Sequence, residues 1–224
     1  MNSIIDLAFR VSGESLPLDH GYSLYSSLSR ISPDLHEAEW LGIHPINGIP
    51  TSPNTLGLTH HSRLRLRLPA DQIPGFIGIA GKRLSLATHA RQYSFTVGVP
   101  EIHSLLPVPN LFSRYVTIKL SEIAKTDQSP TREMFAAAVT AQLQRLNIQG
   151  EVWIDDTRDA RGRELSRRVI RIREKAVVCY SVYIQNLTEE DSLRLQTLGI
   201  GGRRRMGCGI FTPCKSLPTS NARQ

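Results

Sequence analysis

Strict alternation of leucine and arginine in one short segment constrains the fold more than any other feature of this chain. Two sets of residues alternate between positions 63 and 68: Arg63, Arg65 and Arg67 in one set, and Leu64, Leu66 and Leu68 in the other. Successive side chains of a strand point to opposite faces of its sheet. The segment therefore predicts a β-strand with one apolar face and one basic face.

The order of the predicted elements indicates the fold class. Residues 131–146 and 188–198 are predicted as helices, and strand-like segments lie before, between and after them. This order is β-α-β-β-α-β, and the first half of the chain follows it with a weaker second helix over 71–80. The sequence thus predicts an α+β fold made of two ferredoxin-like (RRM-like) βαββαβ units in tandem.

Prolines mark the predicted boundary between these units. Pro100, Pro107 and Pro109 lie close together, and proline interrupts regular structure. We expect an N-terminal domain over residues 1–100, a linker over 101–112 and a C-terminal domain over 113–214. The polar residues 215–224 are expected to form a flexible tail.

The charge balance of the chain favours an acidic partner. The 224 residues include 27 Lys and Arg against 20 Asp and Glu, a net charge of +7, which suits nucleic acid, a phosphorylated ligand or an anionic membrane surface. The three cysteines show no CxxC spacing, which argues against a disulfide-rich secreted domain and a zinc ribbon. No apolar run approaches the ~20 residues of a membrane-spanning helix. We expect a cytoplasmic protein with no membrane partner.

A glycine-rich segment is the strongest functional signal. Five glycines surround Arg203, Arg204 and Arg205, and they are Gly199, Gly201, Gly202, Gly207 and Gly209. Glycines let a backbone approach a ligand closely, and exposed N–H groups can cradle phosphates. The segment is no P-loop, because Cys208 follows Gly207, and it is no dinucleotide fingerprint, because Arg204 stands where the third glycine belongs. The alternative is a solvated connection without a function.

The glycine spacing also carries a family resemblance. The pattern Gly-h-Gly-(x)5-Gly-h-Gly, in which h is hydrophobic, resembles the glycine-rich loop of the CRISPR-associated repeat-RNA-processing endoribonucleases of the RAMP superfamily, at Gly199, Gly201, Gly207 and Gly209. The stretch LPLDHGYSLYSSLSRISPDLHE is similar to the same family. The resemblance in element order covers nearly the whole chain. It implies CRISPR repeat RNA or a crRNA hairpin as the partner, a CRISPR effector complex as a further partner, and neither a metal nor a cofactor.

The resemblance further implies a chemical mechanism. In this family the 2′-hydroxyl upstream of the scissile phosphate attacks in line and leaves a 2′,3′-cyclic phosphate and a 5′-hydroxyl. Such chemistry needs a base, an acid and a cation, and histidine suits the proton transfers because its pKa lies near neutrality. His36 matches the family's Leu-His-Glu, His44 ends the next predicted strand, and Tyr25 matches a phenol that assists the reaction.

Each of these candidate catalytic residues has a structural alternative. A lone histidine is more often structural than catalytic, and His20, at the start of the first predicted helix, competes with His36 and His44. Tyr25 fits equally well as a core residue on the apolar stripe of that helix. No lysine follows His36 or His44 closely, so an arginine from elsewhere in the chain would have to stabilise the phosphorane.

Basic stripes provide the predicted RNA-binding surface. Besides the arginine face at 63–67, the segment 158–175 is rich in arginine, and both stripes can follow a phosphate backbone. The predicted RNA-binding residues are Arg63, Arg65, Arg67, Arg161, Arg163, Arg167, Arg168, Arg171, Arg173, Gly199, Gly201, Gly202, Arg203, Arg204, Arg205, Gly207 and Gly209. Only 6% of the residues are aromatic, which favours recognition of a hairpin backbone over base stacking.

Three classes of function stay open on the sequence. The first is a metal-independent endoribonuclease that matures CRISPR RNA, and the second is a non-catalytic crRNA-binding subunit of a CRISPR effector complex. The glycine-rich segment fits both, whereas His36 and His44 near Tyr25 favour the enzyme, because a protein that only binds RNA does not need them. The third class is a basic nucleotide-binding or ribosome-associated protein, and the failed P-loop and dinucleotide patterns count against nucleotide binding.

Overall fold

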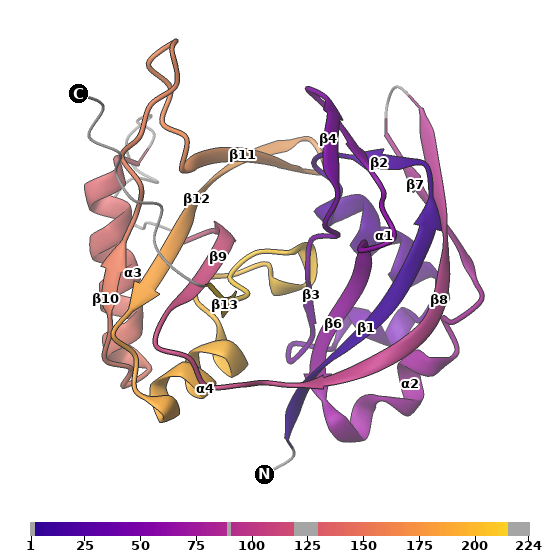
Figure 1. The fold of residues 1–224 in the computed structure, drawn as a ribbon, viewed down its shortest axis with the longest axis horizontal. Helices are drawn as coiled ribbons and strands as arrows, with labels where there is room; N and C mark the ends of the chain where they lie inside the picture. The colour runs from indigo at the N-terminus through magenta and orange to yellow at the C-terminus, as the bar shows by residue number, and fades with distance from the viewer. Residues whose placement is uncertain (1–2, 89–90, 119–129, 215–224) are drawn as a thin grey trace. The chain divides into compact units, whose positions relative to one another are not determined.

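The chain forms two compact units, each with its own sheet and helices (Figure 1). The computed structural model describes residues 3–88, 91–118 and 130–214. The first unit comprises Met1–Leu105 together with Arg204–Gly207, and the second comprises Leu106–Arg203 together with Cys208–Gln224. The predicted tail 215–224 lies outside the described residues.

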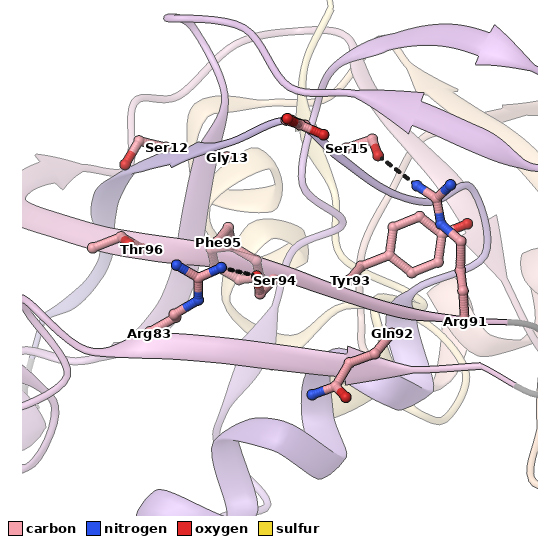
Figure 2. Close-up of a pocket in the computed structure, with 11 residues that line it drawn as sticks. Ser12, Gly13, Ser15, Arg83, Arg91, Gln92, Tyr93, Ser94, Phe95 and Thr96 are labelled. Carbon is pink, nitrogen blue, oxygen red and sulfur yellow. Dashed lines mark hydrogen bonds between the residues drawn. The ribbon is translucent and has the colours of Figure 1, made fainter.

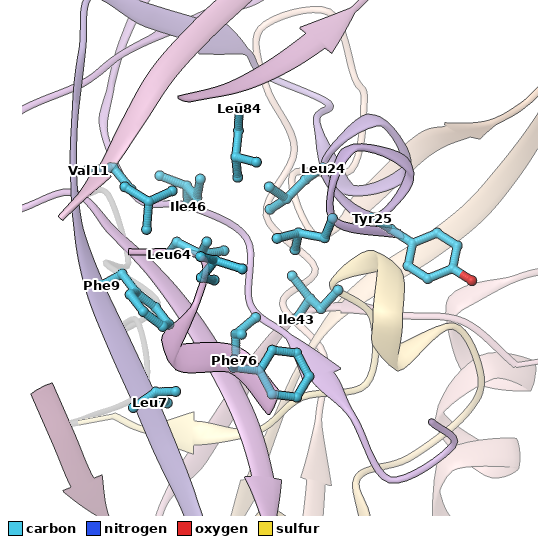
Figure 3. Close-up of a cluster of buried hydrophobic side chains, with 14 of the residues drawn as sticks. Leu7, Phe9, Val11, Leu24, Tyr25, Ile43, Ile46, Leu64, Phe76 and Leu84 are labelled. Atoms are coloured by element: carbon cyan, nitrogen blue, oxygen red, sulfur yellow. The ribbon is translucent and has the colours of Figure 1, made fainter. Parts of the chain in front are cut away.

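An antiparallel five-stranded sheet forms the framework of the first unit. Its strands are, in spatial order, β3 (Gly42–Ile43), β6 (Arg63–Pro69), β1 (Ile4–Gly13), β8 (Gln92–Ser104) and β7 (Arg83–Ala87). Helix α1 (Gly21–Ile31) follows β1, and the short helix α2 (Pro74–Ile77) follows β6, after the 3-10 turn η2 (Ala70–Gln72). The predicted leucine and arginine alternation is confirmed as β6. Its three leucines are fully buried in the core of the unit, together with Leu7 and Phe9 of β1 (Figure 3).

The start of α1 and the segment after it differ from the sequence expectation. Asp19 is a residue type that favours the cap position of a helix, but the helix begins after His20, whose side chain makes no cap bond. His20 is instead fixed in the core: its Nδ1–H donates to the carbonyl of Pro17 (2.9 Å), and its Nε2 accepts from the N–H of Ile46 (2.9 Å). Proline and glycine within 48–57 are typical of a loop, but these residues form β4 (Ile49–Ser52) and β5 (Thr55–Gly57), which join β2 (Ser15–Pro17) in a small sheet of order β2-β5-β4.

The expected linker over 101–112 is too long. Strand β8 continues through Pro100 to Ser104, and its last residues stay paired with β1, as in Asp6 opposite His103. The pairing shifts register just after Phe9, which is opposite Pro100. A bulge is a place where a strand tolerates a proline, because a ladder hydrogen bond is already missing there. The prolines therefore did not mark the end of the strand.

The second unit repeats the same order of elements. Its main sheet runs β10 (Glu151–Trp153), β12 (Lys175–Gln185), β9 (Leu111–Val116) and β13 (Thr212–Pro213), with β11 (Arg167–Ile172) also paired to β12. Helix α3 (Arg132–Arg145) follows β9, and helix α4 (Glu189–Leu198) follows β12. Thr131 and Thr188 cap these helices. The side-chain oxygen of each threonine accepts a hydrogen bond from the N–H group three residues later, at Met134 and at Asp191. Both helices agree with the sequence expectation.

The two sheets share one topology. In the first unit β1 lies between β6 and β8, and β3 lies beside β6. In the second unit β9 lies in the same way between β12 and β13, and β10 lies beside β12. The predicted α+β fold of tandem ferredoxin-like units is thereby confirmed. None of the described helices is long and apolar enough to cross a membrane.

A cluster of charged groups is buried on the strands of the first unit. Asp6 of β1 lies directly opposite Arg67 of β6, and its carboxylate accepts hydrogen bonds from Arg67 Nε (2.8 Å) and Nη2 (3.0 Å). The Nε2 atom of His44 lies 3.4 Å from the same carboxylate. Burial alone would raise the pKa of Asp6, but its contacts with His44 and Arg67 outweigh burial and hold that pKa well below its usual range.

This cluster corrects the prediction that Arg67 binds RNA. Arg67 does point to the arginine face of β6, but its side chain is only 1% exposed. The cause is the cross-strand carboxylate of Asp6, because a paired arginine can be buried whereas a lone one cannot. Arg65 and Arg63 on the same face are half-buried. Arg63 donates from Nη1 to the carbonyls of His60 (2.8 Å) and Ser62 (3.0 Å).

The buried His44 should make the stability of the protein depend on pH. Burial lowers the pKa of His44 to about 4, although Asp6 opposes the shift. Between that value and the ~6.5 of an unfolded histidine, the unfolded chain binds a proton that the folded chain does not, so stability falls as the pH falls. We expect this effect to reach ~3 kcal/mol, at ~1.4 kcal/mol per unit, and to be absent in His44→Gln.

Urea unfolding at a series of pH values from 7 to 4 measures this dependence. The matched control is His103→Gln, which changes an exposed histidine of β8 and should keep the wild-type profile. An unchanged profile in His44→Gln would show that His44 takes up its proton in the folded protein as easily as in the unfolded chain.

Candidate active site

Tyr25 and His36 form a hydrogen-bonded pair at the surface of the first unit. The tyrosine hydroxyl lies 2.8 Å from His36 Nδ1, and the two rings meet edge to face with centroids 5.6 Å apart. The ring of Tyr25 is part of the hydrophobic core, and its hydroxyl points away from the other core side chains (Figure 3). Tyr25 is therefore both a core residue and a candidate site residue, because its buried ring fixes the hydroxyl that contacts His36.

The local fold directs His36 toward solvent. Pro33 starts the 3-10 turn η1 (Pro33–His36) directly after α1, and Leu35 within this turn is buried whereas His36 is exposed. Because Nδ1 is bonded to Tyr25, Nε2 is the ring nitrogen left to meet a substrate. When the Nδ1 atom carries the proton and donates it to the tyrosine oxygen, Nε2 has a free lone pair and can act as a base.

Backbone geometry explains why four of the glycines recur in their pattern. A positive φ, between 66° and 84°, is found at Gly199, Gly201, Gly207 and Gly209. Residues other than glycine rarely adopt this backbone conformation. A Cβ atom at Gly201 or Gly209 would also collide with a backbone carbonyl. Gly202 is different, since it has open space around it and no positive φ. The pattern that resembles the family is therefore the set of glycines that shapes the loop.

The glycine N–H groups do not face a ligand, contrary to the expectation that they cradle phosphates. Gly201 donates to the side-chain oxygen of Gln142 (2.8 Å), Gly202 to the carbonyl of Thr117 (3.1 Å) and Gly209 to the carbonyl of Tyr115 (2.6 Å). The N–H groups of Gly199 and Gly207 bond to backbone carbonyls in the same way. The loop therefore presents arginine side chains, not glycine amides, to a phosphate.

Arg205 contacts the Tyr25 and His36 pair within the first unit. It lies in the 3-10 turn η4 (Arg204–Met206), and its Nη1 donates to the carbonyl of Leu35 (2.9 Å) and to that of His36. Its guanidinium carbon lies 5.7 Å from the centre of the Tyr25 ring. The sequence predicted Arg205 as an RNA-binding residue but gave no sign of this position, because 169 residues separate it from His36.

Arg204 is half-buried and carries a positive charge without a full set of partners among the described residues. Its Nε and Nη2 atoms are buried, and neither has a hydrogen-bond partner among the described residues. Burial, and then the neighbouring charge of Arg67, lower the pKa of Arg204 to about 10. The guanidinium is still charged at neutral pH. A buried cation with unused donors is costly to the fold, and it suits the binding of an anion.

The other candidate histidines are buried in the first unit. His44 is buried beside Asp6 and, with a pKa of about 4, is neutral at pH 7. Its burial and its lowered pKa argue against His44 as the protonated acid of the reaction. His20 uses both ring nitrogens in the core. Of these three histidines only His36 is exposed.

The basic segment of the second unit is a hairpin of β11 and β12 together with the loop before it. Arg161, Arg163, Arg168, Arg171 and Arg173 are exposed, and Arg167 is half-buried. Arg163 pairs with Asp159 (2.7 Å), whereas Arg161 and Arg168 join no ion pair among the described residues. Arg203, at the base of the glycine-rich loop, is also exposed. Within the described ranges, no group of three His, Cys, Asp or Glu side chains lies close enough to hold a metal ion.

Comparison with known proteins identifies the family. The model of the family described as Cas6 Crispr matches residues 5–216. The CRISPR-associated endonuclease Cas6 of Myxococcus xanthus (strain DK1622) is 37% identical over 216 residues, which are 93% of this chain and 81% of that protein.

Solved structures show the same fold at low sequence identity. A CRISPR-associated protein Cas6 has a TM-score of 0.66 at 12% identity, with 95% of this chain and 100% of that chain covered. The CRISPR endoribonuclease Cse3 bound to a 19-nucleotide RNA has a TM-score of 0.51 at 14% identity, with 94% and 98% covered. Since the family model spans nearly the whole chain and a relative shares more than a third of its residues, the chain belongs to the Cas6 family of CRISPR-associated proteins.

Proposed function

We propose that this protein cleaves CRISPR repeat RNA in the precursor transcript, without a metal, to give mature crRNA. Family membership supports the choice of RNA substrate, since the Myxococcus relative carries the name of an endonuclease. The observation that carries the catalytic claim is the exposed His36, held at Nδ1 by Tyr25 and joined at its backbone by Arg205. A protein that only bound RNA would need neither this pair nor the arginine beside it.

The three side chains have separate roles in the proposed reaction. Nε2 of His36 takes the proton of the 2′-hydroxyl, the 2′ oxygen bonds to phosphorus, and the bond to the 5′ oxygen breaks. The products are a 2′,3′-cyclic phosphate and a 5′-hydroxyl, whose proton comes from solvent. Tyr25 is a positioning residue, because its hydroxyl orients the imidazole and its ring is buried.

No lysine follows the candidate histidines closely in the sequence. Arg205 supplies the cation of the proposed reaction instead. Within the part of the chain that the structure describes, its side-chain hydrogen bonds run through Nη1, so the donors on Nε and Nη2 are available to a phosphate. A guanidinium has five donors in a fixed plane and stays charged. Fixed against the backbone of His36, it would stabilise the charge that develops on the phosphorane without having to reorganise.

RNA binding is proposed for exposed arginines of the second unit. Those of the hairpin and the loop before it are Arg161, Arg163, Arg168, Arg171 and Arg173, and Arg203 joins them. They present fork-shaped donors to a phosphate backbone. The half-buried Arg204 of the first unit is proposed to bind an RNA phosphate as well, through the two nitrogens that have no partner among the described residues.

Cleavage of end-labelled repeat RNA in EDTA tests the proposed function. Under single-turnover conditions we expect His36→Ala to slow the cut by about a thousandfold, and Tyr25→Phe by about ten- to a hundredfold, because the imidazole loses its orienting bond. His61→Ala, which changes an exposed histidine of another loop, is the matched control and should cut normally. Tight binding with no cut by the wild type would instead favour the non-catalytic crRNA-binding subunit.

Arg204→Met separates stability from RNA binding. We expect the variant to unfold at higher urea concentration, with a gain of about 1–3 kcal/mol, because it removes a buried charge that lacks partners. We expect it to bind repeat RNA about tenfold more weakly, because the anion loses its donors. Arg203→Met, at an exposed neighbour, should give no gain in stability. A variant that loses stability together with affinity would mean that Arg204 supports the fold.

A further inference from the structure

A polar hollow in the first unit lies outside the residues assigned to catalysis and RNA binding so far. It is formed between the end of β1, the turn that leads to β2, and the hairpin of β7 and β8, and its volume is about 330 Å³. Figure 2 shows two arginines in it, Arg83 from β7 and Arg91 from just before β8, which both extend toward the segment 12–15. Neither arginine was a candidate on the sequence.

Both guanidinium groups are held in place by hydroxyl groups. Nη2 of Arg83 donates to Ser94 Oγ (2.5 Å), and Nη2 of Arg91 donates to Ser15 Oγ (3.0 Å). The guanidinium carbon of Arg91 also lies 4.1 Å from the centre of the Tyr93 ring. These contacts fix the direction of each side chain, so less conformational freedom is lost when the donors bind a ligand.

The charge of the two arginines is not neutralised by the protein. Neither takes part in an ion pair among the described residues, in contrast to Arg10, which pairs with Glu101 (3.5 Å). The carboxylate in the lining belongs to Glu14, which is exposed. The hollow therefore combines two cations, one anion and the hydroxyl groups of Ser12, Ser15, Ser94 and Thr96. Arginine forks and hydroxyl donors together are the side chains that bind phosphate oxygens.

We propose that this hollow, the Arg83–Arg91 site, binds a backbone phosphodiester of the RNA substrate at a nucleotide away from the scissile phosphate. The inference rests on the proposed function, since it assigns a further contact to the same RNA. The arginines stay exposed at the rim, which suits a phosphate on a continuous chain. The RNA strand would thus be held by the first unit at a second point, which fixes its register relative to His36.

RNA affinity of matched double variants tests this site. The probe is a repeat RNA with a 2′-deoxy nucleotide before the scissile phosphate, which cannot be cut by 2′-hydroxyl attack. We expect Arg83→Ala with Arg91→Ala to weaken binding by about ten- to a hundredfold, and to make the slope of log affinity against log salt shallower by about one for each lost phosphate contact. The control, Arg30→Ala with Lys82→Ala, removes the same charge from exposed positions outside the hollow.

Phosphate-ethylation interference locates the contact. Ethylation at one backbone position other than the scissile phosphate should weaken binding to the wild type and have no effect on binding to the Arg83 and Arg91 variant. Equal losses of affinity in the two double variants would overturn the proposal, because they would show a general effect of charge. Wild-type affinity in the Arg83 and Arg91 variant would overturn it too. A wild type that neither binds nor cuts repeat RNA would overturn the proposed function itself, whereas normal cutting with no effect of the variant overturns the site alone.

Discussion

The left-handed backbone of four glycines is the constraint on which the candidate active site depends. Gly199, Gly201, Gly207 and Gly209 turn the chain where a side chain would be strained, and at Gly201 and Gly209 a side chain would collide with carbonyl groups. Between these glycines the residues Arg204–Gly207 belong to the first unit. The glycines thus act on the chemistry indirectly. They shape the loop, and Arg205 within it contacts the backbone of His36.

Charge burial divides the arginines of this protein into two groups. Arg67 is buried with a carboxylate that forms two hydrogen bonds to it, so its charge is balanced and serves the fold. Arg204 is half-buried near that arginine, and two of its nitrogens are buried without a partner among the described residues, so its charge is a cost in the absence of a ligand. Residues that lower the stability of a fold in this way are commonly found at functional sites. Among the exposed arginines, Arg83 and Arg91 join no ion pair with a described residue, whereas Arg163 pairs with Asp159.

Local pattern predicted the regular elements, and it failed where the partner is distant in sequence. The alternation at 63–68 and the threonine-capped helix after Thr131 were found because propensity and periodicity are local. The burial of Arg67 was missed, since Asp6 lies 61 residues away. The strands within 49–57 were missed as well, because proline and glycine there resemble a loop. Pro100 within β8 concealed a strand that passes a bulge.

Of the candidate site, the sequence supplied the residues and the structure supplied their arrangement. Tyr25 and His36 followed from the family resemblance, and their hydrogen bond lies within eleven residues of chain. His44 was named on the same grounds, but its burial beside Asp6 depends on a strand pairing that no local signal reveals. By sequence pattern, nothing distinguishes Arg83 and Arg91 from the other arginines of the chain. They become notable only because hydroxyl groups of neighbouring strands hold them in one hollow.

The central claim is that Arg205 and the Tyr25–His36 pair work as one unit, and a double-mutant cycle tests it most directly. The measurement is the single-turnover rate of repeat-RNA cleavage by Tyr25→Phe, Arg205→Ala and the double variant, at saturating protein. We expect Arg205→Ala to lose about a hundred- to a thousandfold, and the double variant to lose clearly less than the product of the single losses, because each change disturbs the same imidazole. Losses that multiply fully would contradict the account, since they would mean that Arg205 and Tyr25 act independently.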